Sequence, residues 1–217
     1  MIDFAAAREA MVDGQVRPSD VTRYPIIDAM LTVPREDFVP TDLRAVAYQG
    51  AHVPLGGGRV LLDPRTFGKM VDALELTGSD LVLDVGCGLG YSTAVLARIA
   101  EAVVALEEDP DMARQAEAAL GSHDVDNAMV ISAPFSEGVE KHGPFDVIVI
   151  EGGVETVPDE LAEQLKPGGR AVAVFVEDGR GQVRLGIKTA SGIGWRRIFD
   201  GVAPLLPGFE RTKAFEF

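Results

Sequence analysis

The sequence is poor in several residue types, and each shortage excludes a class of protein. It has one cysteine among 217 residues, which rules out an internal disulfide and favours a reducing compartment, so we expect a cytoplasmic protein. No apolar run approaches the roughly 18 residues of a membrane span, and the N-terminus lacks a basic and apolar leader pattern, so we expect no membrane association. The three histidines show no metal-ligand spacing, so we expect no metal site.

Positive charge is also scarce. Lysine and arginine number 20 against 34 aspartates and glutamates, which gives a formal net charge of −14. A surface this acidic argues against non-specific nucleic-acid binding, so we expect no nucleic-acid partner. It also provides no general attraction for an anionic substrate, which local groups would have to draw in. The apolar content of 47% is that of a globular chain with a sizeable core.

The most informative stretch is LVLDVGCGLGY at residues 81–91. Its apolar start predicts a buried parallel strand, its glycines predict a tight turn, and the following residues predict a helix. Gly86 and Gly88 lack a Cβ atom, so they can adopt positive φ and let a ligand approach the backbone. In α/β sheets polar ligands lie at this place, beyond the carboxyl ends of the strands.

An acidic residue, Glu107, ends the next predicted strand, about 20 positions after the first glycine. A carboxylate in that place commonly binds the two hydroxyls of a ribose, so the pattern favours a nucleoside-derived ligand. The glycine spacing G-x-G-x-G differs from the dinucleotide fingerprint G-x-G-x-x-G and argues against an NAD-dependent dehydrogenase. No P-loop lysine follows the glycines, which argues against nucleoside triphosphate chemistry.

Strand and helix patterns alternate after residue 81 and predict an α/β fold with a mostly parallel, doubly wound sheet. We expect one domain over residues 1–217, in which residues 1–62 form a helical cap with a substrate-side hairpin and residues 63–217 form the core. The expected helices include 3–13, 63–76 with Asp63 as its N-cap, and 157–165. The expected strands are residues 81–85, 103–106, 128–132, 145–150, 170–176, 183–188 and 195–199.

The glycine loop, Glu107 and the FDVIVI strand together resemble the class I S-adenosylmethionine-dependent methyltransferases. A longer ordered set resembles one family among them, the protein-L-isoaspartate O-methyltransferases, over nearly the whole chain. That set is VPREDFVP at 33–40, AYQGAHVPLGGG at 47–58, LLDP at 61–64, QLKPGGR at 164–170 and APLLPG at 203–208. The resemblance implies a Rossmann-like class I methyltransferase fold. It also implies methyl transfer from the cofactor S-adenosylmethionine to the free carboxylate of an L-isoaspartyl or D-aspartyl residue in a damaged protein or peptide.

The resemblance also assigns site residues. The expected cofactor-binding residues are Asp84, Val85, Gly86, Cys87, Gly88, Gly90, Tyr91, Glu107, Glu108, Ala133 and Pro134. The expected substrate-binding residues are His52, Val53, Pro54, Leu55, Leu62, Pro204 and Leu205. We assign no catalytic residue, because a carboxylate acceptor is already ionised at pH 7 and needs no strong base.

The sequence departs from the family pattern at the substrate side. The serine of the family's ISQP segment corresponds to Leu62, the aspartate of its AYxD segment to Gln49, and the acidic GDG after the third strand to Ala133, Pro134 and Phe135. A site built around a polar contact works badly when that partner is missing. Two alternatives therefore stay open: a methyltransferase with another, small-molecule acceptor, and a protein that binds S-adenosylmethionine without turnover.

Overall fold

The computed structural model describes residues 2–211 of the chain. Its α-helices are α1 (Phe4–Met11), α2 (Tyr24–Thr32), α3 (Pro64–Ala73), α4 (Tyr91–Ala97), α5 (Pro110–Ser122) and α6 (Asp159–Ala162). Its strands are β1 (Val53–Gly56), β2 (Arg59–Leu61), β3 (Leu81–Val85), β4 (Ala102–Glu107), β5 (Ala128–Ser132), β6 (Phe145–Val154), β7 (Leu165–Glu177), β8 (Arg180–Thr189) and β9 (Gly192–Asp200). No helix in this described part of the chain is both long and apolar enough to cross a membrane.

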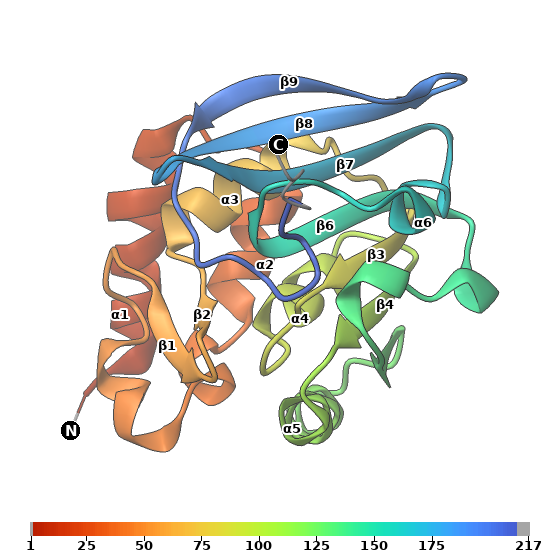
Figure 1. Ribbon diagram of the computed structural model, residues 1–217. Coiled ribbons are helices and arrows are strands. Elements are labelled where there is room, and N and C mark those ends of the chain that lie inside the picture. The colour runs from red at the N-terminus through yellow and green to blue at the C-terminus, as the bar shows by residue number, and fades with distance from the viewer. Residues whose placement is uncertain (1, 212–217) are drawn as a thin grey trace.

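Seven of the strands form one twisted sheet in the order β5-β4-β3-β6-β7-β8-β9 (Figure 1). The first five in that order run parallel, and β8 and β9 are added antiparallel as a meander. The order reverses between β3 and β6, so the chain crosses over beside the glycine loop that follows β3. This topology confirms the predicted mostly parallel, doubly wound sheet. The loop lies where open α/β sheets bind ligands.

The sheet is apolar on both faces, because its central strands are covered on both sides. Alternate residues of the same strand belong to different apolar clusters: Val82 packs with the N-terminal helices, and its neighbour Leu83 packs with the C-terminal segment and α6. The first cluster also contains Met30 and Leu62, so the cap and the sheet share one core. The single-domain organisation itself stays a prediction.

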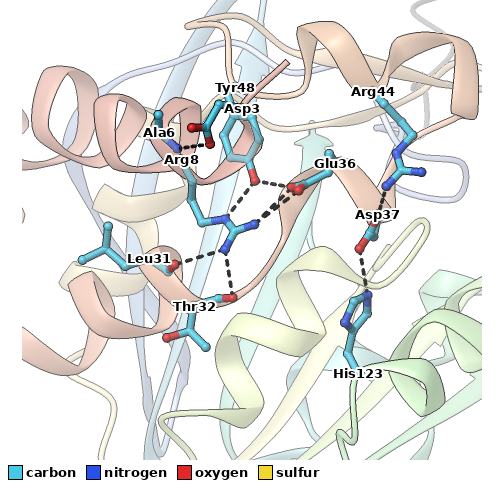
Figure 2. A network of polar contacts seen from close by, with 10 residues as sticks. All are labelled: Asp3, Ala6, Arg8, Leu31, Thr32, Glu36, Asp37, Arg44, Tyr48 and His123. Carbon is cyan, nitrogen blue, oxygen red and sulfur yellow. Dashed lines mark hydrogen bonds and ion pairs between the residues drawn. The ribbon is translucent and has the colours of Figure 1, made fainter. Parts of the chain in front are cut away.

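The N-terminal cap is held together by a polar network around Arg8 (Figure 2). The Arg8 guanidinium donates to the Tyr48 hydroxyl at 2.9 Å and to the Glu36 carboxylate at 3.3 Å, and it also reaches the carbonyl oxygens of Leu31 and Thr32. Tyr48 donates to the same Glu36 carboxylate. Burial, together with the hydrogen bond to Glu36, raises the pKa of Tyr48. These contacts join α1, the end of α2 and the segment before β1.

A second set of polar contacts in Figure 2 connects the cap to the end of α5. Asp37 pairs with Arg44 and lies 3.3 Å from the Nε2 atom of His123, which follows α5. Phe38, beside Asp37 in the sequence, is buried and stacks on His123 with ring centroids 5.3 Å apart. The VPREDFVP segment therefore fixes the cap against the last turn of α5.

Several expected boundaries were wrong for identifiable reasons. Gly14 does not end the first helical segment, because a π-turn over Val12–Val16 and a 3-10 turn over Arg17–Ser19 continue it. The helix expected over 157–165 is only α6, since β7 already begins at Leu165. The strand expected to end at residue 150 continues to Val154, where Gly153 exchanges hydrogen bonds with Pro204 and Leu206. These outcomes depend on tertiary contacts that local patterns do not report.

Candidate functional site

Three acidic side chains gather at the carboxyl edge of the sheet. In register, Val85 of β3 pairs with Leu106 of β4 and with Ile150 of β6, so the residues after these three positions end at one level. The following residues on β4 and β6 are Glu107 and Glu151, which are both buried. Asp84, one residue before the end of β3, is also fully buried. The fold thus concentrates negative charge around the start of the glycine loop.

The glycine loop has the backbone conformation that the sequence predicts. Gly86, Gly88 and Gly90 adopt φ values of +82°, +57° and +97°, which an L-residue with a side chain adopts only under strain. The amide of Gly86 donates to the Leu106 carbonyl at 2.8 Å, which ties the loop to β4. Cys87 is buried, and burial raises the pKa of its thiol, which keeps it protonated. Cys87 therefore occupies the loop as a small, protonated side chain, and its predicted role in cofactor binding stays a prediction.

Asp84 anchors the start of α4. Its Oδ2 atom accepts hydrogen bonds from the hydroxyls of Ser92 and Thr93, both at 2.7 Å. Its other oxygen, Oδ1, is buried and has no partner within residues 2–211. Burial raises the pKa of Asp84 to about 6, although the two hydroxyl donors oppose that change. Asp84 therefore links strand and helix, and one of its acceptor atoms remains unused.

Glu107 is the predicted ribose-binding residue, and it is fully engaged by other groups. Its Oε1 and Oε2 atoms accept from Nη1 of Arg59 at 2.7 and 3.0 Å. The backbone amides of Gly88 and Asp109 donate to the same carboxylate at 2.8 and 3.2 Å. A carboxylate has about four acceptor positions, so this set leaves none for a ribose hydroxyl.

Arg59 and two leucines fill the hollow over the glycine loop. Besides Glu107, Arg59 donates to the Gly86 carbonyl at 2.8 Å, and its guanidinium lies over the Phe135 ring at 4.9 Å. A Cβ atom on Gly88 would come within 2.5 Å of Leu55 Cδ1, and one on Gly86 would lie 3.4 Å from Leu206 Cδ1. Side chains from the β1–β2 hairpin and from the C-terminal segment therefore cover the loop at van der Waals distance.

A second buried arginine orders the substrate side. Arg35 is fully buried and donates to the carbonyl oxygens of Ala47 and Leu62, both at 2.6 Å. Its guanidinium lies 4.8 Å from the centre of the Tyr91 ring, a cation–π contact. Tyr91, which we expected to border the cofactor, is buried between Arg35, Phe38 and Phe67. Leu62 is fully buried, so its side chain is part of the core in this arrangement.

Glu151 is the least satisfied of the three acids. Its Oε1 atom is buried without a hydrogen-bond partner in the described part of the chain. Burial, and then the nearby Asp84, raise the pKa of Glu151 well above its ordinary value, although Arg35 and Arg59 oppose the change. Burial therefore favours the protonated form of this carboxyl group, which can give or take a proton when a ligand changes the local charge.

The remaining predicted residues divide into buried and exposed positions. On the cofactor side Val85 is buried, Ala133 is partly buried, and Glu108 and Pro134 are exposed. On the substrate side Val53 and Leu55 are buried, whereas Pro54, Pro204 and Leu205 are exposed. Leu206, one position beyond the predicted pair, is the side chain that contacts the loop.

His52 joins three segments. Its Nδ1 atom accepts from the amide of Asp63 at 2.9 Å, and its Nε2 atom donates to the Val202 carbonyl at 2.7 Å. Asp63 caps α3 by accepting from the Thr66 amide, which confirms the predicted N-cap. His52 thereby holds the hairpin, α3 and the C-terminal segment together. Its predicted substrate contact stays a prediction.

Two site residues that we did not select are marked by local patterns in the sequence. Glu151 directly follows the apolar strand FDVIVI, the position that made Glu107 a candidate on β4. Arg59 is the one charged residue within the hairpin VPLGGGRVLL. Nothing local marks Arg35, because its role depends on carbonyl groups 12 and 27 positions away. Over residues 2–211 no group of three or more His, Cys, Asp or Glu side chains is arranged to hold a metal ion.

Comparisons of the sequence show closely similar proteins. The family "Protein-L-isoaspartate(D-aspartate) O-methyltransferase (PCMT)" matches residues 6–192. A protein-L-isoaspartate O-methyltransferase of Pelotomaculum thermopropionicum is 39% identical over 86% of this chain and 81% of its own length. A protein-L-isoaspartate O-methyltransferase 2 of Marinobacter nauticus is 36% identical over 94% of each chain.

Comparisons of the fold agree. A solved protein-L-isoaspartate O-methyltransferase superposes with a TM-score of 0.81 at 23% identity, over 93% of this chain and 66% of that one. A Plasmodium falciparum structure, titled as a putative enzyme of the same name in complex with S-adenosyl-L-homocysteine, superposes with a TM-score of 0.78 at 19% identity, over 95% and 99% of the two chains. Fold and sequence therefore lead to one conclusion: this chain belongs to the protein-L-isoaspartate(D-aspartate) O-methyltransferase family, a family of methyltransferase enzymes.

Proposed function

We propose that this chain is an S-adenosylmethionine-dependent methyltransferase that methylates the free carboxylate of isoaspartyl residues in proteins. The observation that carries the proposal is the family match over residues 6–192, which includes the cap, the hairpin and the sheet together. The positive-φ glycine loop and the buried acid at the end of β4 support a nucleoside-type cofactor. A protein substrate and a cytoplasmic location are part of the same proposal.

The backbone of the site fits S-adenosylmethionine, but the side chains in this conformation do not. The loop glycines leave room for a ligand's approach, and Glu107 lies where a ribose would bind. That room is taken by Arg59 and Leu55, and the acceptor atoms of Glu107 are all used. Binding therefore requires the hairpin side chains to leave the loop first.

The chemistry asked of the protein is mainly orientation. When bound, S-adenosylmethionine supplies a methyl group on a sulfonium centre. The acceptor carboxylate is ionised at neutral pH, so the protein does not have to remove a proton from it. What this chain provides is a buried, apolar surround from Leu55, Leu62 and Leu206 that excludes water once ligands are in place.

A matched peptide pair tests the proposal. One peptide carries L-isoaspartate and the other a normal aspartate at the same position, and both are incubated with labelled S-adenosylmethionine. We expect base-labile label on the isoaspartyl peptide alone. Cofactor binding is measured on the same sample by calorimetry with S-adenosylhomocysteine. Binding without transfer to either peptide would refute the proposed acceptor, and absence of binding would refute the methyltransferase proposal itself.

Glu151 favours a second candidate, a methyltransferase for a small acceptor that carries an exchangeable proton. A buried acid with a raised pKa repels a carboxylate acceptor once it is ionised, but it can accept the proton of a hydroxyl or amine. Leu62 also makes the substrate side apolar. Screening hydroxyl and amine acceptors with labelled cofactor tests this candidate. Transfer to the isoaspartyl peptide with no other acceptor labelled would exclude it.

A further inference from the structure

The hairpin residue Arg59 uses the acceptor atoms of Glu107 that a ribose diol would need. Its guanidinium is 7% exposed and makes two hydrogen bonds to Glu107 and one to the carbonyl of Gly86. Of the four hydrogen bonds that Glu107 accepts, those from the amides of Gly88 and Asp109 come from the backbone of the loop and of the α5 cap. Arg59 supplies the other two through a flexible side chain, so it is the donor that a diol can displace.

The pair between Arg59 and Glu107 is buried, so neither charge can be left alone at low cost. An unpaired buried charge is strongly unfavourable, so a partner that leaves has to be replaced by other hydrogen-bond donors. Ribose hydroxyls can replace the guanidinium on Glu107. The released Arg59 then needs a new anionic partner or solvent. The turn of this hairpin consists of Gly56, Gly57 and Gly58, all with positive φ, and a Cβ atom placed on Gly57 or Gly58 would meet no atom of residues 2–211 within 4 Å.

We propose that Arg59 exchanges partners during the binding cycle: it closes the cofactor site by pairing with Glu107, and after cofactor binding it pairs with the carboxylate of the acceptor. The inference rests on the proposed function, because it takes its two ligands from there. It also explains how this acidic chain could attract an anionic acceptor. The net charge of −14 provides no general attraction, so a local cation is needed. Arg59 becomes available as a cation at the site only when the cofactor has taken its place. The order of binding is therefore cofactor first and acceptor second.

Arg59→Met tests both parts of the proposal, competition with the cofactor and binding of the acceptor. The first part predicts tighter cofactor binding in this variant, and the second predicts weaker acceptor binding. Removing the competitor should tighten S-adenosylhomocysteine binding at least about tenfold in calorimetry, since the fraction of open sites rises. Removing the cation should raise the KM for the isoaspartyl peptide at least about tenfold while kcat changes little. Arg59→Lys keeps the charge and should recover most of the KM. Arg65→Met removes an exposed arginine from α3 and should change neither quantity.

Each other result has a definite meaning. Equal cofactor affinity in the wild type and Arg59→Met would overturn the inference and leave the proposed function standing. Loss of cofactor binding in Arg59→Met alone would also overturn it, because Arg59 would then hold the cofactor. Tighter cofactor binding with an unchanged peptide KM would overturn the proposed pairing of Arg59 with the acceptor carboxylate. Failure of every variant and of the wild type to bind S-adenosylhomocysteine would refute the proposed function, and the inference with it.

The unmodified protein offers a second test that does not depend on the folding of a variant. Trypsin cleaves after arginine, and Arg59 is buried in the closed hairpin whereas Arg180, at the start of β8, is exposed and followed by a glycine. We expect S-adenosylhomocysteine to accelerate cleavage after Arg59, measured by the mass of the resulting fragments, with cleavage after Arg180 unchanged. Ligands usually protect a protein from proteolysis. Protection at Arg59 under saturating ligand would overturn the inference.

Discussion

Replacing Asp84 with asparagine should change how the stability of the protein depends on pH. Burial raises the pKa of Asp84 to about 6 in the folded chain, against 3.8 for an ordinary aspartate. The folded state therefore binds this proton more tightly than the unfolded state does. The resulting stabilisation is complete below about pH 4 and is lost as the pH rises through 6. Asparagine does not titrate and removes this dependence.

The size of the effect follows from the difference between the two pKa values. They differ by about two pH units, which corresponds to about 3 kcal/mol in the free energy of unfolding. Relative to the wild type, Asp84→Asn should therefore be about 3 kcal/mol more favoured at pH 8 than at pH 4. Asparagine still offers one oxygen to the Ser92 and Thr93 hydroxyls. Any change in these hydrogen bonds adds a constant difference in the free energy of unfolding, which is the same at every pH.

Urea denaturation at intervals between pH 4 and pH 8 measures this difference directly. Asp126→Asn, at an exposed position, is the control and should follow the wild type at every pH. Adding Glu151→Gln to Asp84→Asn should flatten the dependence further, because burial raises the pKa of both groups. A difference between wild type and Asp84→Asn that stays constant over the whole range would refute the reasoning. A difference of the opposite sign would mean that Asp84 is stabilised as a carboxylate.

Three further substitutions address single contacts. Arg35→Met should lower the free energy of unfolding by about 3–5 kcal/mol, because it abandons two buried carbonyl groups and the Tyr91 ring; an effect below 1 kcal/mol in urea titration would contradict the assigned contacts. Leu62→Ala should cost about 2–5 kcal/mol through a buried cavity, and an unchanged melting temperature would show that Leu62 is not core. Glu151→Gln should stabilise the ligand-free protein above neutral pH, where charging a buried unpartnered carboxyl is costly; destabilisation at pH 8 would show that its charge is compensated.

Local signals in the sequence were sufficient to predict the backbone elements that form the site. The strand-turn-helix unit at residues 81–97 and the acid at the end of β4 follow from apolar runs, glycine and charge within a few positions of each other. Asp63 capped α3 as predicted, because an N-cap depends only on the next three residues. The antiparallel order of β8 and β9 was not predicted, since hairpin patterns do not fix which edge of the sheet they join.

The side chains that cover the glycine loop were harder to predict than these backbone elements. The Arg59–Glu107 pair joins residues 48 positions apart, and the search for a ribose-binding acid considers the strand end alone. Leu206 was missed by one position, because the bridge between Gly153 and Leu205 sets which of the C-terminal side chains turns inward. Contacts of this kind depend on how separate elements pack, which periodicity and spacing do not encode.

The hairpin is closed over the loop because the acid buried at the end of β4, Glu107, needs a cation beside it. Glu107 is fully buried next to Asp84 and Glu151, so within residues 2–211 three acids share the site with the guanidinium groups of Arg35 and Arg59. Arg35 is committed to carbonyl oxygens, which leaves Arg59 as the cation that can neutralise Glu107. A ligand that brings hydroxyl donors and a positive sulfonium satisfies the same acids in another way. Closure of the ligand-free site and affinity for a cationic nucleoside therefore have one electrostatic cause, and a substitution that weakens one should strengthen the other.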